Sequence, residues 1–211
     1  TMFVAVADAM IDQAVAAGLA PRERFVTIRS GMETDNFLPN ADLRRRYRKE
    51  WGVEVESAPQ PLSPSGGEGR VRGLQDALVV VGTIARLFAN KGYEEIMAAM
   101  ASAVMREPRL RFVWVGDGAY RARYERRLET MGLRDRVRML GLVHPDEVAS
   151  CINGFDIILH ASRWEGLPRA VVQGLLTEVP AVSFDNDGAP EVVQTGETGI
   201  LVRFGDISGL S

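Results

Sequence analysis

Cysteine and histidine are scarce in this 211-residue chain, which contains Cys151 as its single cysteine and only two histidines. One cysteine excludes an internal disulfide framework and a zinc site built from cysteines. Its position on an apolar helical segment favours a core residue over a nucleophile. His144 and His160 are sixteen residues apart with no third ligand in view, which argues against zinc. We therefore expect neither a metal ion nor a cofactor.

An excess of positive charge is also lacking, because 25 basic residues face 28 acidic ones and the formal net charge is -3. A general nucleic-acid-binding protein would carry a basic field, so we expect no nucleic-acid partner. The chain has no run of about 18 apolar residues and no basic-then-apolar leader pattern. We expect a cytoplasmic protein. The basic run at 44–49 is interpreted as a solvated helix face, and peripheral contact with the inner membrane surface is the alternative.

The first 75 residues divide into two parts. Residues 1–40 contain an apolar run at 2–6, a helix ending at Gly18, a strand at 25–28 and a turn at 29–31. Because the chain opens directly into this pattern at Thr1, it reads as the middle of a fold. Residues 41–53 predict a highly charged helix. Residues 54–75 are rich in Pro, Ser and Gly, which predicts a flexible insertion or linker.

From about residue 76, continuous apolar runs alternate with helical periodicity. The expected strands cover 78–81, 110–115, 137–140, 157–160, 181–184 and 200–202, and the expected helices cover 93–106, 119–131, 146–152 and 168–178. This alternation is typical of a parallel sheet covered on both faces. Right-handed crossovers then give an α/β, Rossmann-like, doubly wound domain, in which ligands bind beyond the carboxyl ends of the strands.

Two cations follow the first strand of this region, in GTIARLFANKG at 82–92. Arg86 can bind phosphate at two points, Lys91 adds a point charge, and the amides at a helix start add partial positive charge. The segment therefore suits a diphosphate, although two solvated surface charges are an equal alternative. The P-loop spacing is absent.

Two glycine-containing loops give weaker signals. In VGDG at 115–118, Gly116 either lets a ligand approach the backbone or only forms a tight turn. In DNDGAPEVV at 185–193, Gly188 precedes Pro190 at an expected helix start. Taken alone, VGDG favours the plain turn, whereas for DNDGAPEVV a purely structural connection is as good an explanation as a ligand.

The segment SRWEGLPRAVVQGLL at 162–176 carries the most specific pattern. Pro168 is well placed near a helix N-terminus, where its missing N–H costs nothing. The free amides of Leu167, Arg169 and Ala170 could then face an anion.

A carboxylate and an amide flank this helix start, because Glu165 precedes it and Gln173 follows eight positions later. Together they can hold sugar and ribose hydroxyls on either side of a diphosphate. The alternative makes Glu165 a carboxylate favoured by the helix dipole and Gln173 a surface residue.

With these residues in place, residues 76–205 resemble the nucleotide-sugar-binding domain of family-4 retaining glycosyltransferases, which have the GT-B fold. GTIARLFANKG, VGDG and EGLPRAVVQ match that family's motifs in order, spacing and position after strands. The resemblance implies that 1–40 are the end of an N-terminal acceptor domain and its connection to the second domain. The charged helix and the insertion at 41–75 then lie between this part and 76–211, which the resemblance implies are a donor-binding domain truncated at its C-terminus.

The resemblance also implies roles for individual residues. Arg86 and Lys91 would bind the donor diphosphate without a metal ion, and Glu165 would contact the transferred sugar. The backbone around the helix start would support sugar and phosphate, namely at Gly166, Leu167, Pro168 and Arg169.

The resemblance implies further donor contacts at two glycines and at two residues beside the nucleotide base. Gly82 and Gly116 belong to the first two motifs, and Leu142 and Val143 would lie against the nucleotide base. Gln173 stands where the family has a second glutamate that holds ribose hydroxyls. An amide loses the charge-assisted bond, so we expect weaker or differently tuned binding.

The whole protein is thus expected to transfer a hexose from a UDP-, GDP- or ADP-sugar to a sugar or lipid-linked hydroxyl acceptor. The 211-residue chain is expected to be inactive alone, because the acceptor domain is missing from it. Because of Gln173, a nucleotide-sugar-binding scaffold or regulatory protein is the alternative. A sugar epimerase of the same fold ranks lower, because no acid–base pair suited to epimerisation is evident.

Overall fold

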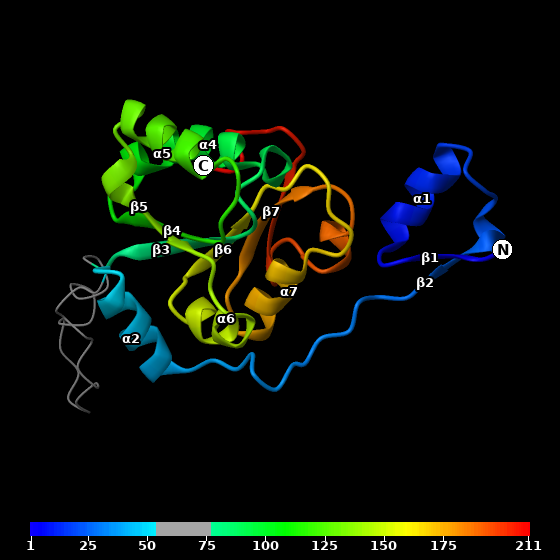
Figure 1. The fold of residues 1–211 in the computed structure, drawn as a ribbon, viewed down its shortest axis with the longest axis horizontal. Coiled ribbons are helices and arrows are strands. Elements are labelled where there is room, and N and C mark those ends of the chain that lie inside the picture. Colours follow the sequence, from blue (N-terminus) through cyan, green and yellow to red (C-terminus); the bar gives the residue numbers. More distant parts are fainter. Residues whose placement is uncertain (54–76) are drawn as a thin grey trace.

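The computed structural model describes residues 1–53 and 77–211. The predicted linker at 54–75 lies outside the described residues. Figure 1 shows a small N-terminal unit beside a larger layered domain built around one sheet. A connecting segment that passes below the larger domain in this view joins the small unit to α2 (Ala41–Glu50).

The N-terminal unit consists of one helix and two short parallel strands. They are β1 (Phe3–Ala5), α1 (Asp8–Ala16) and β2 (Phe25–Thr27), with a 3₁₀ turn at Arg22–Arg24. Helix α1 ends ahead of Gly18, whose φ of 73° is in the left-handed region that favours glycine. The predicted helix and strand of this region are therefore present.

The larger domain contains a six-stranded sheet whose neighbouring strands are all parallel. The strands are β3 (Val79–Ile84), β4 (Leu110–Val115), β5 (Val137–Gly141), β6 (Ile157–His160), β7 (Ala181–Asp185) and β8 (Gly199–Arg203). Their order is β5-β4-β3-β6-β7-β8. This topology confirms the predicted doubly wound, Rossmann-like fold.

Helices cover both faces of the sheet (Figure 1). They are α2, α4 (Tyr93–Arg106), α5 (Arg121–Thr130), α6 (Pro145–Ile152) and α7 (Arg169–Leu176). Side chains alternate along each strand, so Trp114 packs with α4 and α5 while Val113 packs with α2 and α6. Cys151 is buried in the core that contains Val113, which confirms its prediction as a core residue. No helix in the described ranges is long and apolar enough to cross a membrane.

Two local predictions were wrong. The first strand was expected to end at Gly82, but it continues through this residue to Ile84. Gly82 lies against the ring of Phe155, and a Cβ at this position would be 2.2 Å from that ring. Here glycine permits close packing inside a strand and does not end it. The expected helix near Pro190 is only a single 3₁₀ turn at Ala189–Glu191.

Helix α2 is fixed to the sheet by Asp156, which precedes β6. Arg44 and Arg48 both form ion pairs with the Asp156 carboxylate, which also accepts a 2.7 Å hydrogen bond from the amide of Val80. The Arg48 side chain is only 13% exposed. Part of the basic run is therefore structural, which corrects its interpretation as a wholly solvated face.

Replacing Asp156 should destabilise the domain, because Arg48 would be left as a largely buried, unpaired charge. We expect Asp156→Ala to lower the free energy of unfolding by about 2–3 kcal/mol, measured by urea denaturation. Asp42→Ala is the matched control, since Asp42 pairs with Arg45 on the exposed side of α2 and such pairs contribute at most about 1 kcal/mol. Equal losses in the two variants would contradict this role.

Candidate active site

The candidate site lies at the point in the sheet where the order of strand addition reverses. The chain runs outward from β3 to β4 and β5 and then returns to β6, which pairs with β3. Ligands of doubly wound sheets bind beyond the carboxyl ends of strands at this switch point. A cavity of about 590 Å³ opens there, lined by Ile84, Ala85, Arg86, Lys91, Val143, Pro145, Val148, His160, Glu165, Leu167, Arg169, Ala170 and Gln173.

The loop after β3 brings both predicted cations to this cavity. Its start is held by Tyr93, whose hydroxyl donates a 3.0 Å hydrogen bond to the carbonyl of Ala85. Its end turns at Gly92, where φ is 74° and a Cβ would lie 1.8 Å from the carbonyl oxygen of Ala161. Only glycine fits at this position, so the sequence of the loop fixes the path that leads Lys91 into the cavity.

Lys91 and Glu165 meet across the cavity floor. The Lys91 Nζ lies 2.5 Å from Glu165 Oε2, and the two side chains are 14% and 27% exposed. The Ser162 hydroxyl donates a 2.9 Å hydrogen bond to the same oxygen, and the Glu165 amide donates a 2.6 Å bond to Asp187 Oδ2. Glu165 is therefore held by contacts to both its side chain and its backbone.

Arg86 differs from Lys91 in its surroundings. Its guanidinium lies over the ring of Phe88, 5.1 Å from the centroid. Arg86 is exposed and forms no ion pair with any residue that the structure describes. Its charge is thus available at the cavity mouth, whereas that of Lys91 is already paired.

Helix α7 contributes the third side of the cavity. Pro168 is its N-cap residue, and Arg169, Ala170 and Gln173 line the cavity from its first two turns. Leu167 lines it from the preceding loop. The N-terminus of α7 therefore faces the same space as Lys91, which suits a negatively charged group.

The remaining predicted residues lie around the cavity without lining it. Gly82 lies within β3, and Gly116 follows β4 where a Cβ would be 2.1 Å from the carbonyl oxygen of Ala85. Gly166 packs against Val6 of the N-terminal unit, and Leu142 is 81% exposed. The structure thus brings together Arg86, Lys91, Val143, Glu165, Leu167, Arg169 and Gln173.

His160 is a cavity residue that sequence reasoning considered only as a zinc ligand. It is the last residue of β6, it is buried, and burial lowers its pKa to about 4. The Glu165 charge opposes this lowering of the pKa, and the Lys91 charge contributes to it. Its position at the carboxyl end of an expected central strand was the signal that could have identified it.

The loop after β7 connects this site to the N-terminal unit. Asp187 accepts a 2.7 Å hydrogen bond from Gln13 besides holding the Glu165 amide. Glu191 accepts hydrogen bonds from the Asp8 and Ala9 amides at the start of α1, at 2.6 and 3.2 Å. A carboxylate from a distant part of the chain thus caps α1, and the predicted small-residue loop at 185–193 has a structural role.

A parallel, doubly wound sheet with a cationic cavity at its switch point defines a Rossmann-like α/β domain of the nucleotide-binding type. Residues 70–211 match the family described as Glycosyl transferases group 1. The chain belongs to this family, and its fold is that of one half of a GT-B glycosyltransferase.

Individual relatives show how much of such a protein is present. The putative glycosyltransferase EpsD of Bacillus subtilis is 32% identical over 165 residues, which cover 76% of this chain and 42% of that protein. The alpha-D-kanosaminyltransferase of Streptomyces kanamyceticus is 32% identical over 62% of this chain and 33% of its own. The chain therefore spans less than half the length of these relatives.

Solved structures agree on the fold. Anabaena HepE in complex with UDP superimposes with a TM-score of 0.79 at 23% identity, over 99% of this chain and 51% of HepE. The C-terminal domain of the group 1 protein LpcC from Francisella tularensis superimposes with a TM-score of 0.65 at 17% identity, over 84% and 82% of the two chains. The sheet domain thus corresponds to a C-terminal GT-B domain.

Buried His160 should make stability depend on pH. Its folded pKa lies below the unfolded value of about 6.5, so the unfolded chain binds more protons as the pH falls. Stability is full above about pH 6.5 and declines toward pH 4, by about 2 kcal/mol between pH 7 and pH 5. Urea denaturation at both pH values measures this decline.

We expect His160→Gln to weaken the pH dependence, while His144→Gln, at the exposed N-terminus of α6, leaves it in place. If the decline were the same in His160→Gln as in the parent chain, the loss of stability would have to arise from other groups.

Proposed function

We propose that this cavity binds a nucleoside-diphosphate sugar, and that the whole protein transfers the hexose to a hydroxyl acceptor with retention of configuration. The observation that carries the proposal is the convergence of Arg86, Lys91 and Glu165 on one cavity at the carboxyl ends of β3 and β6. Two cations and a carboxylate in this arrangement suit a ligand with a diphosphate joined to a polyhydroxylated ring.

The diphosphate belongs on the side of Arg86, Lys91 and the start of α7. Arg86 supplies a planar fork of donors, and Lys91 has donors left over after its bond to Glu165. The amides in the first turn of α7 add partial positive charge. In the transfer step the bond between the anomeric carbon and the diphosphate breaks with its electron pair staying on the diphosphate, while the acceptor oxygen bonds to the anomeric carbon and gives up its proton to the departing diphosphate. These groups would stabilise that developing charge without a metal ion.

The sugar belongs on the side of Glu165. An ionised carboxylate accepts hydrogen bonds only, and hydroxyls are matching donors. Because Ser162, Lys91 and Asp187 already fix Glu165, little ordering is needed when a sugar binds. Gln173 lies further along α7, where its amide can reach ribose hydroxyls, and Val143 offers an apolar surface to the base.

Proteins similar to this chain differ in the donor that their descriptions name. HepE was crystallised with UDP-glucose, whereas a relative from Mycolicibacterium smegmatis, 25% identical over 203 residues, is described as GDP-mannose-dependent. Backbone recognition of a base leaves little trace in side chains. Titration of this chain with UDP, GDP and ADP therefore precedes any assay of the whole protein.

Binding of the diphosphate should depend on Lys91. We expect one of the three nucleotides to bind saturably in calorimetry, and Lys91→Gln to weaken that binding by about tenfold or more. The matched control is Lys49→Gln on the exposed side of α2, the only other lysine of the chain. Unchanged affinity in Lys91→Gln, or no binding of any nucleotide, would argue against the proposed site.

Restoring a carboxylate at position 173 should strengthen ribose binding. We expect Gln173→Glu to raise nucleotide affinity about three- to tenfold, because a charge-assisted bond replaces a neutral one. Gln194→Glu makes the same charge change at an exposed site away from the cavity. A gain in both variants would reflect overall charge and not contact with ribose.

The same residue supports a second candidate, a binding protein that has lost transfer. In the whole protein, release of nucleoside diphosphate from a donor in the presence of an acceptor identifies an enzyme. Tight donor binding without release, in Gln173→Glu as well as in the parent, identifies a scaffold or regulatory protein.

A further inference from the structure

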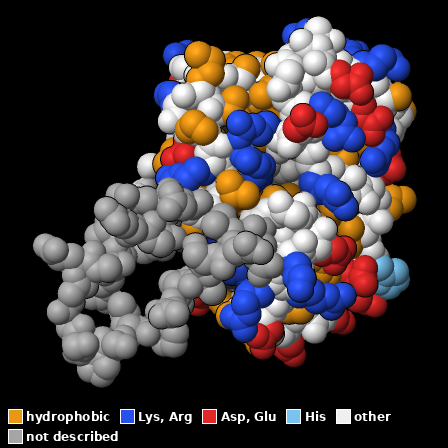
Figure 2. Space-filling model, turned by 90° about the vertical axis from the view of Figure 1, so that its left-hand side faces the viewer, with side chains coloured by type: hydrophobic (Ala, Val, Ile, Leu, Met, Phe, Trp, Pro, Cys, Tyr) orange, Lys and Arg blue, Asp and Glu red, His pale blue; other side chains and the backbone are white. Residues whose placement is uncertain are grey.

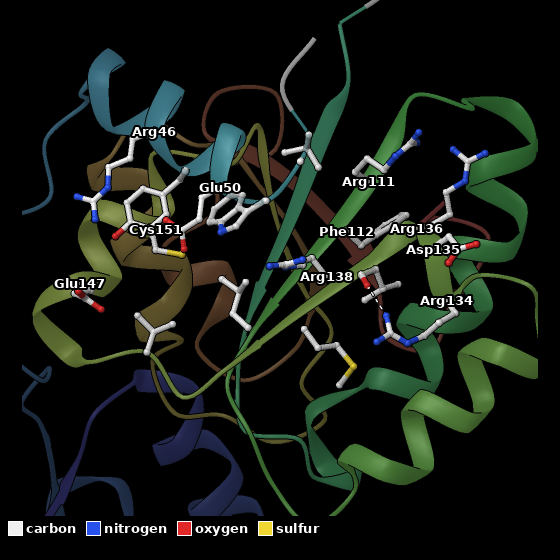
Figure 3. Close-up of a pocket in the computed structure, with 18 residues that line it drawn as sticks. Arg46, Glu50, Arg111, Phe112, Arg134, Asp135, Arg136, Arg138, Glu147 and Cys151 are labelled. Atoms are coloured by element: carbon white, nitrogen blue, oxygen red, sulfur yellow. Dashed lines mark hydrogen bonds between the residues drawn. The ribbon is translucent and has the colours of Figure 1, made fainter. Parts of the chain in front are cut away.

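A second cavity, of about 610 Å³, lies beside β5, the edge strand of the sheet. It opens on the face of the sheet that α2 and α6 cover only in part, and Figure 3 shows its lining. Its charged lining residues are Arg46, Glu50, Arg111, Arg134, Asp135, Arg136, Arg138 and Glu147. Figure 2, which views the molecule from this side, shows several Lys and Arg side chains on the surface.

Three of the arginines are brought together by strand register. Arg111 lies on β4, Arg138 lies on β5, and Arg136 immediately precedes β5. Val113 on β4 pairs with Arg138 on β5, and paired residues point to the same face of a sheet. Arg111 lies two residues before Val113, so its side chain points to that face as well. Like charges on neighbouring strands repel, so this arrangement is unfavourable without a balancing anion.

None of these guanidiniums has a carboxylate partner in the described part of the chain. Arg111 donates a 3.0 Å hydrogen bond to the carbonyl of Pro108, and Arg136 donates to the same carbonyl. Arg134 donates to the carbonyl of Val137 at 3.1 Å. Arg111 also donates a 2.8 Å hydrogen bond to the carbonyl of Leu110, so all of these acceptors are neutral carbonyls. Burial and the nearby charge of Arg136 both lower the pKa of Arg111, as expected for close like charges.

The opposite wall carries two glutamates together with one further arginine, Arg46 on α2. Glu50 is on α2 and Glu147 is on α6, and Figure 3 shows both across the cavity from Arg111 and Arg136. Neither glutamate forms an ion pair with a described residue, so their oxygens are available to accept hydrogen bonds. The cavity therefore has a mostly cationic end, where Asp135 accompanies the four arginines, and an end with two acceptor carboxylates beside Arg46.

We propose that this arginine groove, formed by Arg111, Arg134, Arg136 and Arg138, binds the phosphate of a phosphorylated sugar or polyol. Guanidinium groups bind two oxygens of one phosphate through charge-assisted hydrogen bonds, which neutral carbonyls do not replace. The hydroxyls of the ligand then face Glu50 and Glu147. A cavity of about 610 Å³ has room for both parts of such a ligand.

The groove is separate from the cavity proposed for the donor. Val143 is the residue that both cavities share in the described ranges, while Arg86, Lys91 and Glu165 line only the first. The phosphorylated ligand can be a free sugar phosphate or a lipid headgroup, since both present a phosphate beside hydroxyls. Binding at the groove does not depend on the proposed transferase function.

The test is a calorimetric titration of the 211-residue chain with glucose 6-phosphate, with inorganic phosphate as the simpler probe. We expect saturable binding that weakens at least about tenfold in Arg136→Gln/Arg138→Gln. Arg136→Lys/Arg138→Lys should lose less, because charge remains while two-point bonding is lost. Arg126→Gln/Arg127→Gln, on the exposed side of α5, is the matched control and should bind like the parent.

A second arm measures co-sedimentation with vesicles that contain phosphatidylglycerol. Vesicle binding that is lost in Arg136→Gln/Arg138→Gln identifies a headgroup as the source, and binding of free glucose 6-phosphate identifies a soluble ligand. Either result supports the groove. Thermal unfolding checks that each variant is folded, and Arg138→Gln alone replaces the double variant if the latter does not fold.

Three results would overturn the proposal. The first is no binding in either arm, and the second is an equal loss in the α5 control, which would indicate a charge effect spread over the surface. The third is binding lost in Arg86→Gln but kept in Arg136→Gln/Arg138→Gln, which would move the ligand to the first cavity. Loss of nucleotide binding in Lys91→Gln concerns the first cavity only, so the two proposals fail independently.

Discussion

The ion pair between Lys91 and Glu165 joins the two loops from which the candidate site is built. Lys91 follows β3 and Glu165 follows β6, so their 2.5 Å contact closes the end of the sheet where its two central strands meet. Both side chains are largely withdrawn from water, and removal of either would leave the other as a poorly solvated charge. A diphosphate that enters the cavity must therefore join an existing charge pair.

The rest of the site supports this pair from outside. Gly92 sets the path of the first loop, while Asp187 holds the backbone of the second. Asp187 and Glu191 also contact the N-terminal unit, through Gln13 and the start of α1. Contacts from three separate parts of the chain thus keep the Glu165 carboxylate and the Lys91 ammonium at fixed positions, which is the condition for electrostatic stabilisation of a bound ligand.

Much of the fold could be predicted, because buried parallel strands leave continuous apolar runs: the expected strands at 110–115 and 157–160 coincide with β4 and β6. The motif residues of the site were also recognisable in sequence. Asp187 was not, because its contact with Glu165 spans 22 residues and needs an unusual φ of 49°. The grouping of Arg111 with Arg136 and Arg138 depends on strand register, which no local pattern reveals.

The switch in strand order has a thermodynamic consequence. The loop after β3 supplies Arg86 and Lys91, whereas the segments after β6 supply Glu165 and Gln173. Strands β3 and β6 pair through only a short register. A ligand in the cavity would touch both halves of the domain and add its binding free energy to their association. Ligand would then suppress local opening most strongly where β3 pairs with β6. The slowing of amide hydrogen exchange on ligand binding would be largest in these two strands.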